Sequence, residues 1–470
     1  MTFKGRTNEL EFLEECFASD RFEFLVVLGP RRVGKSALLR RFIKGKKAVY
    51  FTGLEADNAV NLRNLSLAIQ FGLREPEGGV FVDNDAAFKY LFRRSRDERI
   101  VIVFDEFPFA SRADRSLASV LQYLIDRHHK SSKMMLLLCG SPVPTMEKET
   151  LNYSAPLYGR RTGQLRLRPL NFFDARAFLP HRTSEEAALL YGAVGGIPCY
   201  LKEVDGEGSI DEILKKAWFS ESSFFAEEPG NLLRREVRAP EIYFSALLAI
   251  AEGASRLSEI SSRLGKESAA TVSVLRTLTE LGLVVREIPY GTLASRRSRY
   301  RIADHLLRFW STFFEPNTPI LARGGTEDAV LERMRPHLSA YMGPVFTEIC
   351  RDWLWRQRIR AHTPLLFNNL AAWWGTDPET KRKVEIELMG EENEQKALFA
   401  ACRWTDDPVD EDVLDTLEVR SRRLFRYAER YLYVFSRSGF TDACRRRAAE
   451  LSNVKLVTFA EMVDEIPITD

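Results

Sequence analysis

The sequence predicts an α/β fold in three parts: a parallel sheet flanked by helices, a small helical module that ends in a hairpin, and a second α/β module. Three observations support this. Apolar strand patterns alternate with helical patterns in the first third of the chain, three helices and two strands are indicated over residues 241–304, and a helix, strands, helix, strand order follows residue 335. Because 470 residues are too many for one hydrophobic core, several domains are expected.

Composition indicates a globular protein with no membrane span. Hydrophobic residues make up 45% and charged residues 29% of the sequence. No apolar run approaches the ~20 residues of a membrane helix, and the charged start MTFKGRTNELEFLEE lacks the apolar stretch of a signal peptide. The six cysteines form no CxxC pair, which favours free thiols. We therefore expect a cytoplasmic protein, and a net charge of +2 says little about its partners.

The first element with a chemical meaning is FLVVLGPRRVGKS, residues 24–36, followed by the helical pattern ALLRRFI. Two glycines in GxxxxGKS allow the backbone to curl, so that successive N–H groups point at phosphate oxygens. The lysine would reach the β and γ phosphates, and the serine hydroxyl would complete a magnesium shell. The pattern predicts ATP and Mg²⁺ as cofactors. The expected binding residues are Gly29, Pro30, Arg31, Arg32, Val33, Gly34, Lys35, Ser36 and Ala37.

An acidic pair follows the second apolar strand, IVIVF at 100–104. In an open parallel sheet, ligands lie beyond the carboxyl ends of the strands, which places Asp105 and Glu106 beside the phosphate loop. Asp105 is the expected magnesium partner, together with Ser36. Glu106 is the expected catalytic residue that orients the attacking water.

Two further candidates lie after the third apolar strand, MMLLLCGS at 134–141. Ser141 either senses the γ phosphate or caps the following helix. In the glycine-bounded stretch SAPLYGRRTGQLRLRPL, Arg160 and Arg161 are either a surface charge pair or the source of an arginine that stabilises transition-state charge. Of the two, Arg160 is our catalytic candidate.

Six motifs, in order and over about the first 300 residues, resemble the archaeal-type ATPases of the STAND branch of the AAA+ superfamily. They are FKGRTNELEFL, GPRRVGKS, FDEFP, LLCGSPVPTM, PLYGRRTGQLRLRPL and YGAVGGIPCYL. The resemblance implies that Gly5 and Arg6 lie by the adenine. It also implies that the turn at Gly195, Gly196 and Pro198 closes over the nucleotide from a helical lid.

Residues 241–304 have the element order of a winged helix-turn-helix. EIYFSALLAIAEG, RLSEISSRLG and SAATVSVLRTLTELGL predict three helices, and VVREIPYGTLASRRSRYRI predicts a two-stranded wing. The module either contacts DNA or packs against the lid to hold the closed state. On the third helix we expect the less buried positions to be Thr271, Ser273, Arg276 and Thr277. The wing would contact phosphates through Arg286, Arg296, Arg297, Arg299 and Arg301.

The stretch from residue 335 has the core order of restriction-endonuclease-like folds, and it resembles the C-terminal domain of unknown function that accompanies many of these ATPases. MGPVFTEICRDWLWRQ predicts a helix, AAWWG a turn, VEIELM and KALFAACRW two strands, and RLFRYAERYLYVFSRSGFTDACRRRAAE a helix, a strand and a helix. Family members with an intact PD-(D/E)XK site typically show FE, EID and ECK. The corresponding residues here are Phe346-Thr347, Glu385-Ile386-Glu387 and Ala401-Cys402-Arg403.

These replacements predict a nuclease-like fold without cleavage. A nuclease of this type needs oxygen ligands for Mg²⁺ and a lysine near the attacking water. Glu387 can still hold a metal, and Glu348 can replace the missing helix acid, but alanine cannot ligate. Arg403 can neutralise phosphate charge, yet it is a poor proton acceptor. The module is expected to serve either as a docking surface for DNA or protein, or as an oligomer-packing element.

The predicted organisation is an ATPase core at 1–170, a helical lid at 171–238, a winged helix at 239–310, a connector at 311–334 and a degenerate nuclease-like domain at 335–470. The predicted function is an ATP-binding and ATP-hydrolysing switch of the signal-transducing or scaffolding type. Two alternatives remain: an ATP-gated DNA nuclease, against which the ACR triplet argues, and a nucleotide-responsive DNA-binding regulator with little turnover, against which Glu106 argues. The partner stays open between DNA, another protein and a second copy of the chain.

Overall fold

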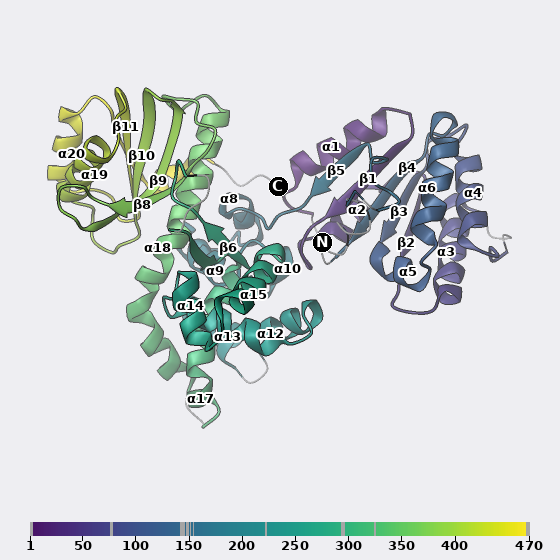
Figure 1. The fold of residues 1–470 in the computed structure, drawn as a ribbon, viewed down its shortest axis with the longest axis horizontal. Helices are drawn as coiled ribbons and strands as arrows, with labels where there is room; N and C mark the ends of the chain where they lie inside the picture. Colours follow the sequence, from purple (N-terminus) through teal and green to yellow (C-terminus); the bar gives the residue numbers. More distant parts are fainter. Residues whose placement is uncertain are drawn as a thin grey trace. The chain divides into compact units, whose positions relative to one another are not determined.

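A computed structural model of the chain describes residues 3–75, 79–141, 146, 150, 152–153, 155–220, 223–292, 297–323 and 326–466. The chain forms two compact units (Figure 1). Unit 1 contains Met1–Pro169 and Ile197–Cys199, and unit 2 contains Leu170–Gly196 and Tyr200–Asp470. Within the described ranges, no helix is both long enough and apolar enough to cross a membrane.

Unit 1 contains a five-stranded sheet of parallel strands in the order β2-β3-β4-β1-β5. Its strands are β1 (Glu23–Leu28), β2 (Ala48–Thr52), β3 (Val101–Asp105), β4 (Met135–Gly140) and β5 (Gly163–Arg166). Strands β1, β3 and β4 are buried along their whole length. That burial explains why they read in the sequence as continuous apolar runs rather than as alternating patterns.

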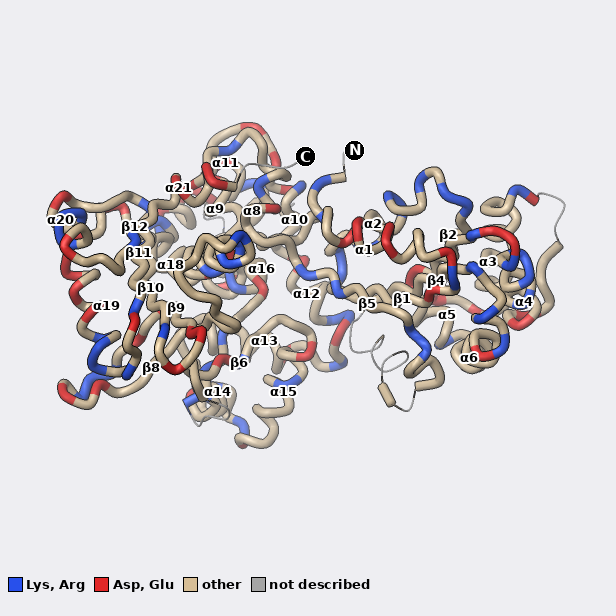
Figure 2. The backbone as a smooth tube through the Cα atoms, turned by 90° about the horizontal axis from the view of Figure 1, so that it is seen from above, with Lys and Arg blue, Asp and Glu red and all other residues tan. Residues whose placement is uncertain are grey.

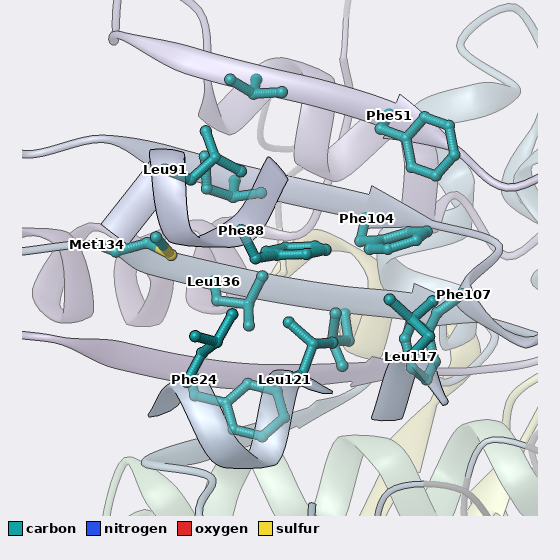
Figure 3. Packing of buried hydrophobic residues seen from close by; sticks show 14 of the residues in the cluster. Phe24, Phe51, Phe88, Leu91, Phe104, Phe107, Leu117, Leu121, Met134 and Leu136 are labelled. Atoms are coloured by element: carbon teal, nitrogen blue, oxygen red, sulfur yellow. The ribbon is translucent and has the colours of Figure 1, made fainter. Parts of the chain in front are cut away.

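One helix of unit 1 precedes β1, and the other helices named here connect the strands from β1 to β4. In chain order, these helices are α1 (Thr7–Ala18), α2 (Lys35–Phe42), α3 (Asn58–Leu73), α4 (Asn84–Arg94), α5 (Phe107–Ala113) and α6 (Leu117–His128). One core cluster joins α3, α4 and α6 to the sheet, and Figure 3 shows part of it. There Phe88 of α4 stacks on Phe104 of β3, with ring centroids 6.3 Å apart. This core fixes the carboxyl end of β3, where the acidic pair lies.

The first part of unit 2 is helical. Its elements are α8 (Phe172–Ala175), α9 (Ser184–Val194), α10 (Pro198–Glu203, which begins in unit 1), α11 (Ile210–Leu214) and α12 (Phe224–Glu236). Helix α9 begins with a capping box, in which the Thr183 hydroxyl accepts from the Glu186 N–H and the Glu186 carboxylate accepts from the Thr183 N–H. The Leu170 N–H donates to the Gly196 carbonyl, so the two ends of Leu170–Gly196, the first stretch of unit 2, lie together.

Three helices and an antiparallel hairpin follow, at the positions predicted for them. They are α13 (Pro240–Ala251), α14 (Leu257–Leu264), α15 (Ser268–Glu280), β6 (Val284–Glu287) and β7 (Arg299–Ile302). Their assignment as a winged helix stays a prediction. One expectation is wrong: Thr271 is fully buried, because it points from α15 into the interior, whereas Ser273 and Arg276 are exposed and Thr277 is half-buried.

A connector and one long helix join the hairpin to the last sheet. The connector contains α16 (His305–Phe309), a π-helical turn (Trp310–Phe314) and α17 (Thr318–Leu321). Helix α18 then runs over 33 residues, Glu327–Ile359. The sequence predicted a helix over MGPVFTEICRDWLWRQ, which begins at Met342, and the structure begins it much earlier, at Glu327, with Thr326 as its N-cap. The internal Pro336 and Pro344, which are unusual inside a helix, concealed this start from pattern analysis.

The C-terminal part of unit 2 is a mixed five-stranded sheet in the order β12-β11-β10-β9-β8. Its strands are β8 (Ala371–Thr376), β9 (Lys383–Asn393), β10 (Lys396–Arg403), β11 (Glu429–Ser436) and β12 (Val454–Thr458), and its helices are α19 (Glu411–Leu424), α20 (Asp442–Glu450) and α21 (Phe459–Asp464). The prediction of a turn at AAWWG is wrong, because these residues form the edge strand β8, which pairs with β9. The α/β class predicted for both ends of the chain is confirmed.

Basic and acidic residues are interspersed along both units (Figure 2). Many of them form ion pairs with neighbours in the same unit, such as Arg447 with Asp415 and Glu418. The function of a charged residue therefore has to be argued from its own contacts.

Candidate functional site

The loop between β1 and α2 has the backbone geometry of a phosphate cradle. Three of its residues have positive φ: 157° at Gly29, 62° at Arg32 and 99° at Gly34. A Cβ at Gly29 would lie 2.6 Å from the carbonyl oxygen of Leu167, so only glycine fits there without a shift. Gly34 is the N-cap of α2, whose N-terminus contributes positive potential. The loop is thus suited to an anion that accepts hydrogen bonds from its N–H groups.

Lys35 is held inside the curve of this loop. Its side chain is 6% exposed, and Nζ donates to the carbonyl oxygens of Gly29 at 2.8 Å and Pro30 at 2.9 Å. Burial lowers the pKa of Lys35, and the nearby carboxylates of Asp105 and Glu106 oppose that shift. The ammonium group is therefore fixed where the loop N–H groups converge, which fits a polyphosphate.

Ser36 and Asp105 meet as predicted from their places after β1 and β3. The Ser36 hydroxyl donates to Asp105 Oδ2 at 2.6 Å, and the Tyr50 hydroxyl donates to the same oxygen at 2.6 Å. Asp105 is almost fully buried, and its Oδ1 accepts from the Glu106 N–H at 3.1 Å. A hydroxyl and a carboxylate in contact form a donor pair of the kind that Mg²⁺ prefers. The residues present therefore fit a magnesium-bound nucleotide.

Glu106 has a strained backbone that sets the direction of its side chain. Its φ of 48° is in the left-handed region, which costs a residue with a side chain of order 1–3 kcal/mol. The carboxylate accepts from the Ser141 N–H at 3.4 Å and from the Ser141 hydroxyl at 3.3 Å. The structure thus brings together the two candidates Glu106 and Ser141 at the ends of β3 and β4. The charge of Glu106 acts on Lys35, but in the described part of the chain its carboxylate forms no hydrogen bond with Lys35 or Ser36.

Of the residues implied by the family resemblance, Gly5, Arg6 and Pro198 belong to unit 1, whereas Gly195 and Gly196 belong to unit 2. Gly5 and Arg6 both have positive φ, and Arg6 donates to the carbonyl oxygens of Val33 at 3.2 Å and Arg168 at 2.6 Å. A Cβ at Gly34 would lie 3.9 Å from Pro198 Cγ. Arg6 and Pro198 are therefore both placed at the phosphate loop.

The remaining loop residues differ in exposure. Val33 is fully buried, Pro30 and Arg31 are half-buried, and Ala37 is exposed on α2. The Arg32 guanidinium lies 3.9 Å from the Cys199 sulfur. Cys199 is a neighbour of the site that sequence reasoning missed.

Arg160 and Arg161 lie near the amino-terminal end of β1, and the phosphate loop lies at its carboxyl-terminal end. They precede β5, and the following residue, Thr162, donates its N–H to the Phe24 carbonyl at the start of β1, whereas the phosphate loop follows the end of β1. Arg160 is held by Asp126 through two hydrogen bonds of 2.7 Å each, and Arg161 is exposed. Neither arginine is brought to the phosphate loop of its own chain, so the expected delivery could come only from a second copy.

In the C-terminal sheet, Glu387 and Arg403 pair with each other. Arg403 Nη1 donates to Glu387 Oε1 at 2.6 Å. Ala401, at the position of the missing acid, is 2% exposed and packs in the core of the sheet. The Glu387 carboxylate, which was predicted to hold a metal, is therefore already paired with the Arg403 guanidinium.

Glu348 points away from that pair. Its carboxylate accepts from Arg301 of β7 at 2.7 Å and from the His305 ring at 2.9 Å. Although burial raises it, the pKa of Glu348 is held well below its ordinary value by the charges of His305 and Arg301. The predicted set Glu348, Glu387 and Arg403 is not brought together. Among the described residues, no group of three or more His, Cys, Asp or Glu side chains could hold a metal ion.

The predicted wing arginines are largely engaged within unit 2. Arg299 pairs with Glu385 at 2.8 Å and stacks over Trp374, and Arg301 pairs with Glu287 as well as Glu348. The Arg297 carbonyl accepts from the Trp374 indole. Arg286 is exposed, and Arg296 lies outside the described residues. The hairpin therefore packs on the C-terminal sheet, where Tyr290 also joins the core cluster of that sheet.

Tyr50 is a second neighbour of the site that sequence reasoning missed. It lies on β2, where Thr52 is paired with Asp105 in the parallel register, so that Tyr50 reaches the same carboxylate from the neighbouring strand. Burial, followed by the charge of Asp105, raises the pKa of Tyr50. The only signal was a polar residue in the half-buried strand AVYFT, whose neighbour in the sheet the sequence does not specify.

Comparison with protein families gives two matches in this chain. Residues 3–204 match the family described as an ATPase domain predominantly from Archaea. Residues 310–420 match the family described as Archaea bacterial proteins of unknown function. The order of the two matches agrees with the resemblance inferred from the motifs.

Individual relatives come from archaea. An uncharacterised protein of Methanocaldococcus jannaschii is 29% identical over 408 residues, 86% of this chain and 88% of that one. An uncharacterised ATP-binding protein of the same organism is 40% identical over 45 residues, 10% of this chain and 76% of that one. Among solved structures, the Walker-type ATPase of Pyrococcus abyssi is 20% identical with a TM-score of 0.51, over 66% of this chain and 96% of that one. This last likeness concerns the fold.

Proposed function

We propose that this chain is an ATP-driven switch that binds and hydrolyses ATP. Its first part matches the ATPase family found predominantly in Archaea, and a later part matches the family of archaeal and bacterial proteins of unknown function. The observation that carries the proposal is the convergence of Ser36 and Asp105 beside the loop that holds Lys35. Glu106, next to Asp105, supplies a carboxylate at the same edge of the sheet. These are the groups that phosphoryl transfer to water requires.

Each residue has a defined part in this proposal. The loop N–H groups and Lys35 bind the β and γ phosphates, and Ser36 and Asp105 hold Mg²⁺, which neutralises charge on the phosphate oxygens when bound. Glu106 orients the attacking water, and Ser141 fixes the Glu106 carboxylate through its N–H and hydroxyl. Tyr50 holds the carboxylate of Asp105 in position.

The switch part of the proposal rests on how the chain connects the loop to unit 2. Pro198 belongs to unit 1 and lies by Gly34, whereas the residues on both sides of Ile197–Cys199 belong to unit 2. A nucleotide that orders the loop and Pro198 therefore acts on the covalent connection to unit 2. Arg6, which donates to the Val33 carbonyl of the loop, and the preceding Gly5 form the proposed adenine side.

For unit 2 we propose a role in binding and packing, with no cleavage of DNA. The Glu387–Arg403 pair and the buried Ala401 support the loss of a metal site. The engagement of Arg299 and Arg301 within unit 2 favours the packing role of the hairpin over DNA contact. Ser273 and Arg276 of α15 and Arg286 of β6 then remain as exposed predicted contacts to a duplex among the described residues.

We also propose that the boundaries predicted from the sequence describe the domains: 1–170, 171–238, 239–310, 311–334 and 335–470. The proposed location is the cytoplasm, where ATP is abundant. A catalytic part for Arg160 requires a second copy of the chain and release from Asp126. We therefore propose Arg161, which is exposed, as the arginine that such a neighbour would present.

The experiment that tests this function measures the binding of ATP and Mg²⁺ to the purified full chain by titration calorimetry. The Lys35→Ala variant is expected to lose tight binding, because the ammonium that neutralises the phosphates is gone. Lys47→Ala is the matched control, since Lys47 pairs with Glu98 at 2.5 Å, away from the loop. Equal ATP affinity in the wild type and the Lys35→Ala variant would refute the proposed site.

A further inference from the structure

A cavity with a basic lining lies entirely within unit 2, whereas the phosphate loop belongs to unit 1. It has a volume of about 580 Å³ and is lined by residues of α13, β7, the connector and α18. Its basic lining residues are Arg301, Arg308, Arg333 and His337. No aspartate or glutamate is among the described residues that line it. A cavity of this size is within the range of small-ligand sites, and its excess of cationic groups favours an anion.

Arg308 is the observation that points to a ligand. Its side chain is 8% exposed, and none of its three guanidinium nitrogens has a hydrogen-bond partner among the described residues. Asp304 and Glu348 are close enough to interact electrostatically, but neither accepts a hydrogen bond from it. A buried guanidinium without an acceptor is rare, because each unpaired donor keeps its full cost of desolvation.

Unpaired buried polar atoms are concentrated around this cavity. Of the twelve such side-chain atoms found in the described residues, six belong to the stretch 308–317. Two of the residues concerned, Arg308 and Asn317, line the cavity, and Asn317 retains an unpaired Oδ1. The cavity thus offers both guanidinium donors and an amide oxygen to a bound molecule.

The opposite wall is one face of α18. Arg333, His337 and Tyr341 follow one another at intervals of four residues and therefore lie on the same side of the helix. The Tyr341 ring lies under the Arg308 guanidinium, 4.8 Å from Cζ to the ring centroid. Apolar lining comes from Ile250, Phe313, Pro316, Met334 and Pro344. Cationic groups and an apolar wall together suit an anion that is attached to an organic body.

We propose that this cavity binds a small phosphate ester, with the phosphate on Arg308 and Arg333 and the organic body against Phe313 and Met334. Arginine forks match the geometry of phosphate oxygens and can donate two hydrogen bonds at once. Arg301 is already paired with Glu287 and Glu348. Arg308 and Arg333 therefore present two guanidinium groups to the ligand, with no carboxylate among the described lining residues, which favours a phosphate dianion over a monovalent carboxylate. The site is separate from the phosphate loop and does not depend on the proposed ATPase activity.

The test is titration calorimetry of the full chain with phenyl phosphate and with inorganic phosphate. The chain is first saturated with Mg²⁺ and a non-hydrolysable ATP analogue, so that the phosphate loop is occupied. One saturable site is expected, which phenyl phosphate fills more tightly than inorganic phosphate. Equal affinities would assign the free phosphate ion as the ligand, and no saturable binding of either probe at millimolar concentration would overturn the proposal.

Substitutions separate binding from a structural role. Arg333→Gln changes an exposed residue, so the fold should be kept, and about a tenfold or larger loss of affinity is expected for the lost charged hydrogen bond. Arg308→Met should abolish binding. Arg335→Gln is the matched control, because Arg335 is exposed on the same helix, pairs with Asp211 and does not line the cavity. If binding is the same in Arg333→Gln as in the control, the site is wrong, whatever Arg308→Met does to folding.

Thermal unfolding provides a second measurement on the same proteins. Phenyl phosphate should raise the unfolding temperature of the wild type and of Arg335→Gln, and it should raise that of Arg333→Gln much less. An equal rise in all three proteins would assign the effect to another site and would overturn the proposal.

Discussion

Glu348 and Arg301 form a half-buried ion pair, in which Arg301 Nη1 donates to Glu348 Oε1 at 2.7 Å. The pair joins α18 to β7, and the second carboxylate oxygen accepts from His305 of α16. His305 Nδ1 faces the Tyr191 carbonyl oxygen at 2.9 Å, and the Gly195 position lies against the same ring. One carboxylate therefore ties the long helix, the hairpin and the helical segment of unit 2 together.

The first prediction concerns the stability of this link. Glu348→Gln should lower the free energy of unfolding by about 2–3 kcal/mol, because it leaves the half-buried Arg301 and the buried His305 without their anion. The measurement is urea denaturation of the full chain, followed through the transition of unit 2. Glu385→Gln is the matched control: its side chain is 48% exposed and its pair with Arg299 should contribute at most about 1 kcal/mol. Equal losses in both variants would contradict the structural role of Glu348.

Glu348 also shows where sequence reasoning fails. The residue was predicted as a substitute metal ligand because of its place one position after Thr347 in a helix that resembles a nuclease helix. Its actual partners lie 47 and 43 residues earlier in the chain. A motif records local spacing, and only tertiary packing decides which distant charges meet.

The second prediction is a pH dependence from a neighbour on the same helix. Burial, followed by the charge of Glu348, raises the pKa of Asp352 to about 7. Because the unfolded value is about 3.9, folding takes up a proton between these pH values, and the ionised group destabilises the fold above about pH 7. That cost decreases as the pH falls through 7 toward 4. Arg351, Arg356 and Asp174 also act on this carboxyl.

The Asp352→Asn variant checks this prediction. Relative to the wild type, it should gain about 1–3 kcal/mol more stability at pH 8 than at pH 4. Glu332→Gln, an exposed change on the same helix, should show no such difference. If the gain of Asp352→Asn is the same at both pH values, the buried-acid account of this position is refuted.

The third prediction concerns Tyr50 and magnesium. Tyr50→Phe removes the hydroxyl that donates to Asp105 Oδ2, so the carboxylate should be less well placed. We expect a several-fold higher Mg²⁺ concentration for half-maximal ATPase activity. Tyr90→Phe is the matched control, since Tyr90 also donates to a carboxylate, that of Glu75, elsewhere in unit 1. An unchanged Mg²⁺ requirement in Tyr50→Phe would show that Tyr50 does not position the metal partner.

The fourth prediction concerns DNA. The purified chain should not cleave plasmid or linear DNA with Mg²⁺ or Mn²⁺, with or without ATP. The Glu387 carboxylate is paired with Arg403, and Ala401 offers no metal ligand. Cleavage that disappears in Glu387→Gln would contradict this and would support the ATP-gated nuclease. A preparation that hydrolyses ATP is the positive control for folding.

Much of the fold was predictable because the decisive signals were local. The runs at β1, β3 and β4 are continuous and apolar, and GxxxxGKS follows the first of them directly, so the phosphate loop and its sheet followed from adjacent residues. The edge strand β8 was missed because its AAWWG pattern is half-buried and its pairing with β9 is not visible in the sequence. Tyr50 was missed for the same reason: it reaches Asp105 through strand order, and that order is a property of the assembled sheet.

The central claim is that Glu106 orients the attacking water beside the Ser36–Asp105 pair, and the most direct test is a single-turnover assay with Glu106→Gln. The variant keeps the loop, Lys35 and the strained backbone of residue 106, and it removes only the carboxylate charge. The account predicts ATP affinity close to that of the wild type and a hydrolysis rate reduced by at least about a hundredfold. Hydrolysis at the wild-type rate in Glu106→Gln would contradict it.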